Sequence, residues 1–356
     1  MSPRPLALAL VAPLVSPIAE PFLGGSQALL FDLAQELAAR GHAVTLFGAD
    51  GSRVPGVEVA RLGIQAETLR AASFSIVEHD AALRERERVS FLRIAYEIRR
   101  RADEFDVVHN HAFDAPAYEL LCDAHPRIIH TLHLPPVLPT VVSAAAAAAE
   151  RATMVTVSSF MVRAWAGAVH GLRLIRNGVP VARIPFHDRP GEGWLFVGRI
   201  APEKGLEDAL DAAELAGRRL RVVGGVYDAT YHARLEARLE RHEMLGALPR
   251  SGVFLEMAQA QGLLMPVKWD EPFGLAAAEA MAAGCPVAAY ARGALPEVIG
   301  DRVGGYLVED MRVESLATAA EAFGAIDRAA CRTWAAEHFD LARMVDDYVT
   351  LYRELA

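Results

Sequence analysis

The sequence predicts an α/β protein made of two successive doubly wound domains, each with a parallel sheet covered by helices. Short apolar runs alternate with helical segments along the chain, as expected for parallel strands joined by crossover helices. This alternation stops in a loop near residues 178–192 and then starts again, so the pattern occurs twice. The 356 residues, 53% of them hydrophobic, are enough for two domains with sizeable cores.

The first half of the chain begins as strand, glycine turn, helix and strand. The apolar run LALALVAP predicts the first strand, a helix follows through Arg40, and HAVTLFG predicts the second strand. The apolar start also resembles a signal peptide, but its removal would delete the first strand of a complete βαβ unit, so we expect a strand. A charged helix from about Ala81 to Arg101 precedes the expected strands DVVHNH, RIIHTLHLP and MVTVSS. The alanine run at residues 144–149 predicts an ordinary helix, since it contains no glycine or proline.

The second half repeats this order. The expected strands are WLFVGRI, RLRVVGG, GLLMPV, PVAAY and GGYLVE. The expected helices cover Leu206–Ala216, Tyr231–Leu245 and Ala276–Ala283, and the last of them ends at Gly284. We therefore expect an N-terminal domain over residues 1–180 and a C-terminal domain over residues 181–335. Ligands bind at the carboxyl ends of the strands in such sheets, and two domains facing each other would form a cleft.

The bulk composition excludes several classes of partner. A net charge of −9 and a pI near 5.8 argue against a nucleic acid or an anionic membrane as the main partner. The three cysteines show no paired or metal-type spacing, which fits a reducing cytoplasm and packing roles. No uninterrupted apolar stretch of about 18 residues occurs, so no membrane span is expected.

Two glutamates stand out in the apolar segment DEPFGLAAAEAMAAGCPV. Glu271 precedes an expected helix and Glu279 lies inside it, and about 3.6 residues per turn put both carboxylates on roughly the same side. The free amides at the helix start, around Gly274 and Leu275, would lie between them and suit a phosphate. Carboxylates for hydroxyls and amides for phosphate indicate a sugar nucleotide. In the alternative interpretation, Glu271 only complements the helix dipole and Glu279 is solvated.

The segment FVGRIAPEKG places two cations after a predicted buried strand. Arg199 ends the strand, and Lys204 lies in the loop before the next helix. The planar fork of arginine and the mobile charge of lysine together suit a diphosphate leaving group. The alternative is a solvated surface pair.

Glycines and histidines mark strand ends in the first half. Gly24 and Gly25 of GGSQ follow the first strand, where a ligand or the facing domain could approach the backbone, although the motif does not match G-x-G-x-x-G. His109 and His111 end one strand, and His133 ends another. Histidine donates to sugar hydroxyls or shuttles protons, whereas a zinc site would need a third ligand with recognisable spacing. We expect His111 and His133 to be functional and His109 to point into packing.

Taken together, these motifs resemble family 4 of the retaining glycosyltransferases, which have the GT-B fold. EPFGLAAAE with its continuation AMAAGCPVAAYARGALPEVI is similar to the family's signature region, VGRIAPEKG and LIRNGV match further C-terminal landmarks, and GGSQ and HNHAF match N-terminal ones. The terminal segment HFDLARMVDDYVTLYREL resembles the helix that returns to the N-terminal domain, which would cover residues 336–356. The resemblance extends over nearly the whole chain.

The resemblance implies roles for individual residues. Glu279 would bind the nucleotide ribose and Glu271 would lie near the donor sugar, while Arg199 and Lys204 would bind the diphosphate. His111 would lie near the C6 hydroxyl of the sugar. We therefore expect His111, Glu271, Arg199 and Lys204 to be catalytic, and we expect Gly24, Gly25, His133, Gly274, Leu275 and Glu279 to bind the donor.

The implied activity is the transfer of a hexose-type sugar from a nucleoside-diphosphate sugar to an unidentified acceptor hydroxyl. We expect a UDP-sugar rather than a GDP-sugar, no cofactor, and no metal ion, since the sequence contains no D-x-D motif. Two alternatives are a GT-B sugar-nucleotide epimerase and a non-catalytic protein that binds sugar nucleotides. The sequence departs from the family at MPVKWDEPFG, where Val267 and Lys268 replace the serine usually found after the proline. Lys268 and Trp269 would either pack the loop or form a wall beside the substrate.

Overall fold

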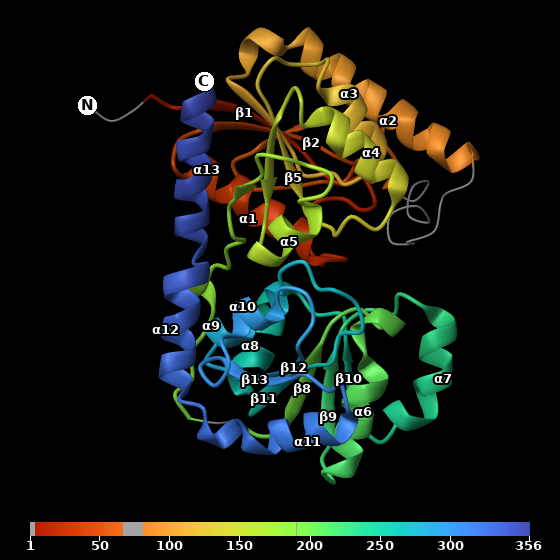
Figure 1. Ribbon diagram of the computed structural model, residues 1–356, viewed down its shortest axis with the longest axis vertical. Coiled ribbons are helices and arrows are strands. Elements are labelled where there is room, and N and C mark those ends of the chain that lie inside the picture. The colour runs from red at the N-terminus through yellow and green to blue at the C-terminus, as the bar shows by residue number, and fades with distance from the viewer. Residues whose placement is uncertain (1–3, 67–80, 190) are drawn as a thin grey trace. The chain divides into compact units, whose positions relative to one another are not determined.

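The computed structural model describes residues 4–66, 81–189 and 191–356, which form two compact units (Figure 1). Unit 1 comprises Met1–Ala19, Ser26–Arg176 and Ala342–Ala356, and unit 2 comprises Glu20–Gly25 and Asn177–Leu341. Each unit contains a parallel sheet with helices packed against it. The predicted fold class, two doubly wound α/β domains, is therefore confirmed.

In the described part of unit 1, the sheet has seven strands in the order β3-β2-β1-β4-β5-β6-β7. The strands are β1 Ala7–Val11, β2 Ala43–Phe47, β3 Glu58–Ala60, β4 Val107–Asn110, β5 Ile128–Leu132, β6 Thr153–Thr156 and β7 Arg173–Leu174. The helices are α1 Gly25–Ala39, α2 Ala81–Arg100, α3 Ala115–Leu121, α4 Pro139–Ala148, α5 Ser159–Trp165 and α13 Leu341–Leu355.

In the described part of unit 2, the sheet has six strands in the order β10-β9-β8-β11-β12-β13. The strands are β8 Trp194–Val197, β9 Leu220–Val223, β10 Glu243–Gly246, β11 Gly262–Met265, β12 Val287–Tyr290 and β13 Gly305–Val308. The helices are α6 Leu206–Leu215, α7 Ala229–Leu239, α8 Arg250–Gln259, α9 Leu275–Ala282, α10 Leu295–Ile299, α11 Val313–Glu321 and α12 Arg328–Phe339.

Each sheet reverses its strand order at the first strand of its unit. In unit 1, β1 lies between β2 and β4, and in unit 2, β8 lies between β9 and β11. Ligands of doubly wound sheets bind at the carboxyl ends of the strands beside such a reversal. The residues that follow β4 in unit 1 include His111, and those that follow β8 and β11 in unit 2 include Arg199 and Glu271, so within each unit these residues lie at the strand ends where a ligand is expected.

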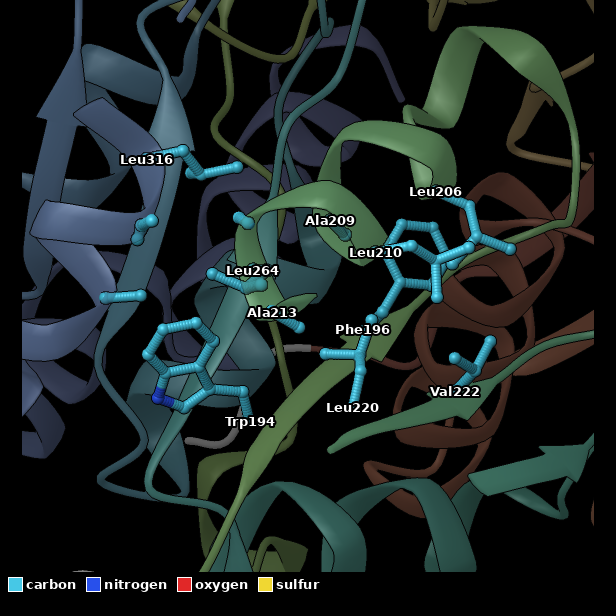
Figure 2. Close-up of a cluster of buried hydrophobic side chains, with 14 of the residues drawn as sticks. Trp194, Phe196, Leu206, Ala209, Leu210, Ala213, Leu220, Val222, Leu264 and Leu316 are labelled. Carbon is cyan, nitrogen blue, oxygen red and sulfur yellow. The ribbon is translucent and has the colours of Figure 1, made fainter. Parts of the chain in front are cut away.

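The core of unit 2 forms where α6 packs against β8 and its neighbours (Figure 2). α6 buries Leu206, Ala209, Leu210 and Ala213, whose spacing of three and four residues gives one apolar face. Trp194 of β8 packs edge-on against Phe323, with ring centroids 6.3 Å apart. This core fixes the loop between β8 and α6, which carries Arg199 and Lys204.

The expected helix Tyr231–Leu245 is wrong in its second half. α7 ends at Leu239, and Glu243–Gly246 forms the edge strand β10, which pairs in parallel with β9. Leucine, methionine and glutamate in this stretch favour a helix locally, but pairing with the open edge of β9 outweighs that propensity. Helix α8, Arg250–Gln259, follows this strand and was not predicted from the sequence.

The expected terminal helix is interrupted at Asp340. α12 ends at Phe339 and α13 begins at Leu341, and Asp340 has an extended backbone with φ −65° and ψ 140°. The backbone N–H of Val179 donates to the carbonyl of Phe339 at 2.7 Å, and the N–H of Leu341 donates to the carbonyl of Val179 at 2.9 Å. These two bonds replace the hydrogen bonds that a continuous helix would make. α12 belongs to unit 2 and α13 to unit 1.

Gly205, at the start of α6, allows a close backbone approach that can be tested. Its φ is +73°, and an added Cβ would lie 1.9 Å from the carbonyl oxygen of Pro266. Gly217 is a matched control, because its φ is +63° but an added Cβ would meet nothing within 4 Å. We expect Gly205→Ala to lower the free energy of unfolding by about 1 to 3 kcal/mol more than Gly217→Ala, since only the first overpacks against backbone. Urea denaturation measures both, and equal losses would contradict this contact.

Candidate active site

The loops after β8 and β11 carry most of the predicted site residues of unit 2. β8 is followed by Arg199 and by the short 3-10 turn Pro202–Lys204, and β11 is followed by the loop 266–274 that leads into α9. Because β8 and β11 are paired neighbours, both loops leave the same edge of the sheet. They bring Lys204 and Glu271 into direct contact.

Lys204, Trp269 and Glu271 form a compact group, which we call the switch-point cluster. The Lys204 Nζ atom lies 2.9 Å from Glu271 Oε2, and the Trp269 Nε1–H group donates to the same oxygen at 2.8 Å. The Lys204 ammonium also lies 5.0 Å from the centroid of the Trp269 ring, within the range of a cation–π contact. The Lys204 and Glu271 side chains are only 18% and 11% exposed, so solvent screens this ion pair weakly.

Glu279, inside α9, forms a second ion pair with Arg250 at the start of α8. Arg250 donates to Glu279 Oε1 through Nη2 at 2.6 Å and through Nε at 3.2 Å. The two side chains are 11% and 12% exposed. Glu279 is therefore not the solvated helix residue of the alternative interpretation. Sequence reasoning missed Arg250 because α8 was not expected.

The start of α9 suits an anion. Gly274 adopts φ +98° as the residue before the helix, no side chain caps α9, and its first turn, which the structure describes in full, holds no acidic residue. Backbone amides at such a helix start carry a partial positive charge that favours an anion, and Glu271 lies close to it, since an added Cβ on Gly274 would be 3.8 Å from Glu271 Cγ. Gly25, which belongs to unit 2 together with Gly24, lies against this start, since an added Cβ would be 2.8 Å from Leu275 Cδ1.

Arg199 and Lys268 have partners other than those of the switch-point cluster. Arg199 donates to Glu203 at 3.1 Å, and its guanidinium lies 4.8 Å from the ring centroid of Tyr227. Lys268, 42% exposed, lies 2.6 Å from Asp208 Oδ1. This ion pair connects the loop after β11 to α6.

In unit 1, the histidines at the strand ends form a buried chain of hydrogen bonds. His111 Nδ1 lies 3.0 Å from His133 Nε2, and His111 Nε2 lies 3.2 Å from His109 Nδ1. His109 Nε2 lies 2.7 Å from the hydroxyl of Thr131, and His109 Nδ1 lies 2.7 Å from the hydroxyl of Tyr352 on α13. Both ring nitrogens of His111 are thus engaged by other histidines.

Burial keeps these histidines neutral. His109 and His111 have no exposed surface and His133 is 6% exposed. Desolvation lowers the pKa of His133 to about 4 and lowers the pKa values of His109 and His111 well below 6.5. Of the two histidines bonded to His111, only His133 has exposed surface. Across the described ranges, no group of three or more potential ligands has the arrangement of a metal site.

Comparison with known families agrees with this architecture. Residues 23–183 match the family model described as Glycosyltransferase Family 4, and residues 187–329 match the model described as Glycosyl transferases group 1. The chain belongs to glycosyltransferase family 4.

The curated relatives are similar to part of this family 4 chain. A 2-deoxystreptamine glucosyltransferase of Streptomyces kanamyceticus is 40% identical over 133 residues, or 34% of this chain and 33% of that protein. The chain spans less than half the length of the first curated relatives that it matches.

Two solved structures are similar to this family 4 chain over nearly its whole length. A sucrose-phosphate synthase of Thermosynechococcus elongatus has a TM-score of 0.80 at 20% identity, covering 98% of this chain and 99% of that one. The Anabaena protein HepE, in complex with UDP and glucose, has a TM-score of 0.75 at 17% identity, covering 97% and 99%. These similarities show that the family 4 chain has the GT-B fold. None of its described helices is both long and apolar enough to span a membrane.

Proposed function

We propose that this chain is a retaining glycosyltransferase that moves a hexose-type sugar from a nucleoside-diphosphate sugar to an acceptor hydroxyl. The proposal rests chiefly on the arrangement at α9, where Glu271 precedes the helix, Glu279 lies inside it, and each is paired with a mostly buried cation. Carboxylates beside an uncapped helix start fit the hydroxyls and phosphates of a sugar nucleotide. The UDP and glucose bound to HepE support a UDP-sugar over a GDP-sugar.

Each residue of the site has a proposed task. Glu279 accepts hydrogen bonds from the ribose hydroxyls, and Glu271 accepts them from the donor sugar. Arg199, Lys204 and the first amides of α9, from Gly274 and Leu275, neutralise the diphosphate. Gly24 and Gly25 have no side chains, so the donor can approach the backbone there. His111, with its partner His133, contacts the sugar.

The proposed reaction exchanges one bond at the anomeric carbon of the donor. The bond to the diphosphate oxygen breaks, the nucleoside diphosphate leaves, and the acceptor oxygen attacks from the same face. The acceptor proton passes to the departing phosphate oxygen, so no side chain serves as a dedicated general base. Lys204 and Arg199 stabilise the negative charge that develops on the leaving group. No cofactor takes part in the proposed reaction.

Incubation with UDP- and GDP-sugars tests the proposal. With a panel of hydroxylated acceptors, mass spectrometry should detect a glycosylated product and an equal amount of nucleoside diphosphate, and the anomeric proton coupling of the product should match that of the donor. An epimerised donor formed without acceptor would instead indicate a sugar-nucleotide epimerase. Donor binding without any turnover would indicate a binding protein.

Removal of divalent ions is expected to leave transfer largely unchanged. Arg199, Lys204 and the start of α9 supply the positive charge that a metal ion would otherwise provide to the leaving diphosphate. Initial rates should be measured after dialysis against EDTA, with the same sample reconstituted with Mg²⁺ or Mn²⁺ as the comparison. A loss of rate that either ion restores would show that the cationic side chains do not suffice.

A further inference from the structure

The Trp269 indole contacts both other members of the switch-point cluster. We infer that Trp269 is a positioning residue for Glu271, and that its N–H group keeps the Glu271 carboxylate in place while Lys204 interacts with the donor diphosphate. This inference rests on the proposed function, because it concerns how Glu271 and Lys204 bind the same sugar-nucleotide donor.

The two oxygens of Glu271 have different surroundings. Oε2 accepts hydrogen bonds from both Lys204, at 2.9 Å, and Trp269, at 2.8 Å. Among the described residues, no group donates a hydrogen bond to Oε1, although the side chain is only 11% exposed. Oε2 therefore holds the carboxylate to the protein, and Oε1 is the oxygen that a sugar hydroxyl would meet.

Lys204 alone would hold Glu271 poorly during turnover. A lysine ammonium is a mobile point charge on a flexible stem, and a diphosphate competes for it with more negative charge than one carboxylate carries. When Lys204 turns toward the phosphate, its bond to Oε2 weakens. The indole N–H is a donor only, and it sits on a rigid side chain with two rotatable bonds, so it remains on Oε2.

The backbone on both sides of Trp269 is anchored, which fixes the direction of the indole. Before it, the Lys268 N–H donates to the Glu203 carbonyl at 2.8 Å, and the Lys268 ammonium pairs with Asp208. After it, the carbonyl of Glu271 accepts from the N–H of Ala294 at 2.8 Å. If Trp269 only packed the loop, the apolar ring of its side chain would be sufficient. The N–H adds a hydrogen bond to a mostly buried carboxylate, and bonds of this kind are stronger than those to neutral acceptors.

A pair of tryptophan substitutions separates this role from packing. Trp269→Phe keeps an aromatic ring beside Lys204 and removes the N–H donor. Trp334→Phe is the matched control, because the Trp334 indole N–H donates at 3.0 Å to the backbone carbonyl of Val298, outside the switch-point cluster. Trp269→Phe should lower kcat about tenfold or more, the scale of one hydrogen bond to a charged group. UDP affinity should stay within about twofold, and Trp334→Phe should keep wild-type kcat.

A double-mutant cycle with Glu271→Gln decides whether Trp269 acts through Glu271. We expect Trp269→Phe to cause no further loss of kcat in the Glu271→Gln background. Equal fractional losses in both backgrounds, or a loss in Trp269→Phe that only matches a fall in stability, would overturn the inference.

Nuclear magnetic resonance of the indole N–H groups keeps this test separate from the proposed function. The signal lost in Trp269→Phe identifies Trp269, and Glu271→Gln should shift that signal while leaving the other three tryptophan signals in place. Addition of UDP should not release it. An unshifted signal, or one that UDP releases, would refute the hydrogen bond even if transfer occurs. A shifted signal in a protein that turns over no donor would refute the proposed function and confine Trp269 to a structural bond.

Discussion

Acidification from pH 7 to pH 5 is expected to destabilise unit 1 steeply. Four buried histidines, His109, His111, His130 and His133, have pKa values lowered by burial, to about 3 for His130 and about 4 for His133. They stay neutral in the folded protein while the unfolded chain binds protons below about pH 6.5. Their contribution to stability is therefore complete above pH 6.5 and is lost as the pH falls toward the folded values.

One buried carboxyl opposes this trend. Burial raises the pKa of Glu87 in α2 to about 7 from an ordinary 4.5, so the folded protein holds a proton there that the unfolded chain lacks. For these five groups, four protons taken up on unfolding minus one released leaves a net uptake of three, and His42 and His242, whose pKa values burial also lowers, add to that uptake. At about 1.4 kcal/mol per proton and pH unit, the free energy of unfolding should fall by about 4 kcal/mol per unit between pH 6 and pH 5.

Urea denaturation followed by circular dichroism at pH 7, 6 and 5.5 measures this slope. His130→Phe is the informative variant, because His130 bonds to Asn110 rather than to the histidine chain. This variant should lower the number of protons taken up on unfolding by about one. The change in slope does not depend on how the variant affects stability at pH 7. If the wild-type slope corresponds to the uptake of less than one proton on unfolding, these histidines titrate normally in the fold.

Removing either partner of the Arg250–Glu279 pair is expected to cost about 3 to 5 kcal/mol of stability, because the remaining charge stays largely buried without its partner. Replacing both residues, as in Arg250→Met with Glu279→Leu, should recover most of that loss, since apolar side chains of similar size tolerate the same surroundings. Thermal or urea unfolding of the two single variants and the double variant measures the coupling between the residues.

The stabilised double variant also tests the donor-binding role of Glu279. If Glu279 holds the ribose, the double variant should bind UDP about tenfold to a hundredfold more weakly, although its fold is intact. Arg221 and Glu256 provide a control pair, 2.5 Å apart and similarly buried, with Glu256 on the same helix α8 as Arg250. Replacing that pair should leave UDP binding unchanged in isothermal titration. Wild-type UDP affinity in the Arg250–Glu279 double variant would remove Glu279 from the nucleotide site.

Local sequence signals predicted most of the fold and part of the candidate site. Apolar runs and the spacing of Glu271 and Glu279 reflect periodicity within one element, so the strands and α9 could be predicted. The partners of the site residues could not, because they come from distant segments. Arg250 is 29 positions from Glu279, and Tyr352 is 243 positions from His109. Edge strand β10 was missed for a related reason, since its pairing with β9 decides its conformation.

The return of the chain to unit 1 has a consequence for synthesis on the ribosome. α13 is made after all of unit 2, yet its Tyr348 and Tyr352 are fully buried and bond to Thr131 and His109 in the sheet of unit 1. The unit that emerges first therefore cannot complete its core until residues 342–356 have been translated. A chain truncated before residue 342 should expose that core to proteases and chaperones, and an exchange of unit 1 between relatives must carry residues 342–356 together with its two earlier segments.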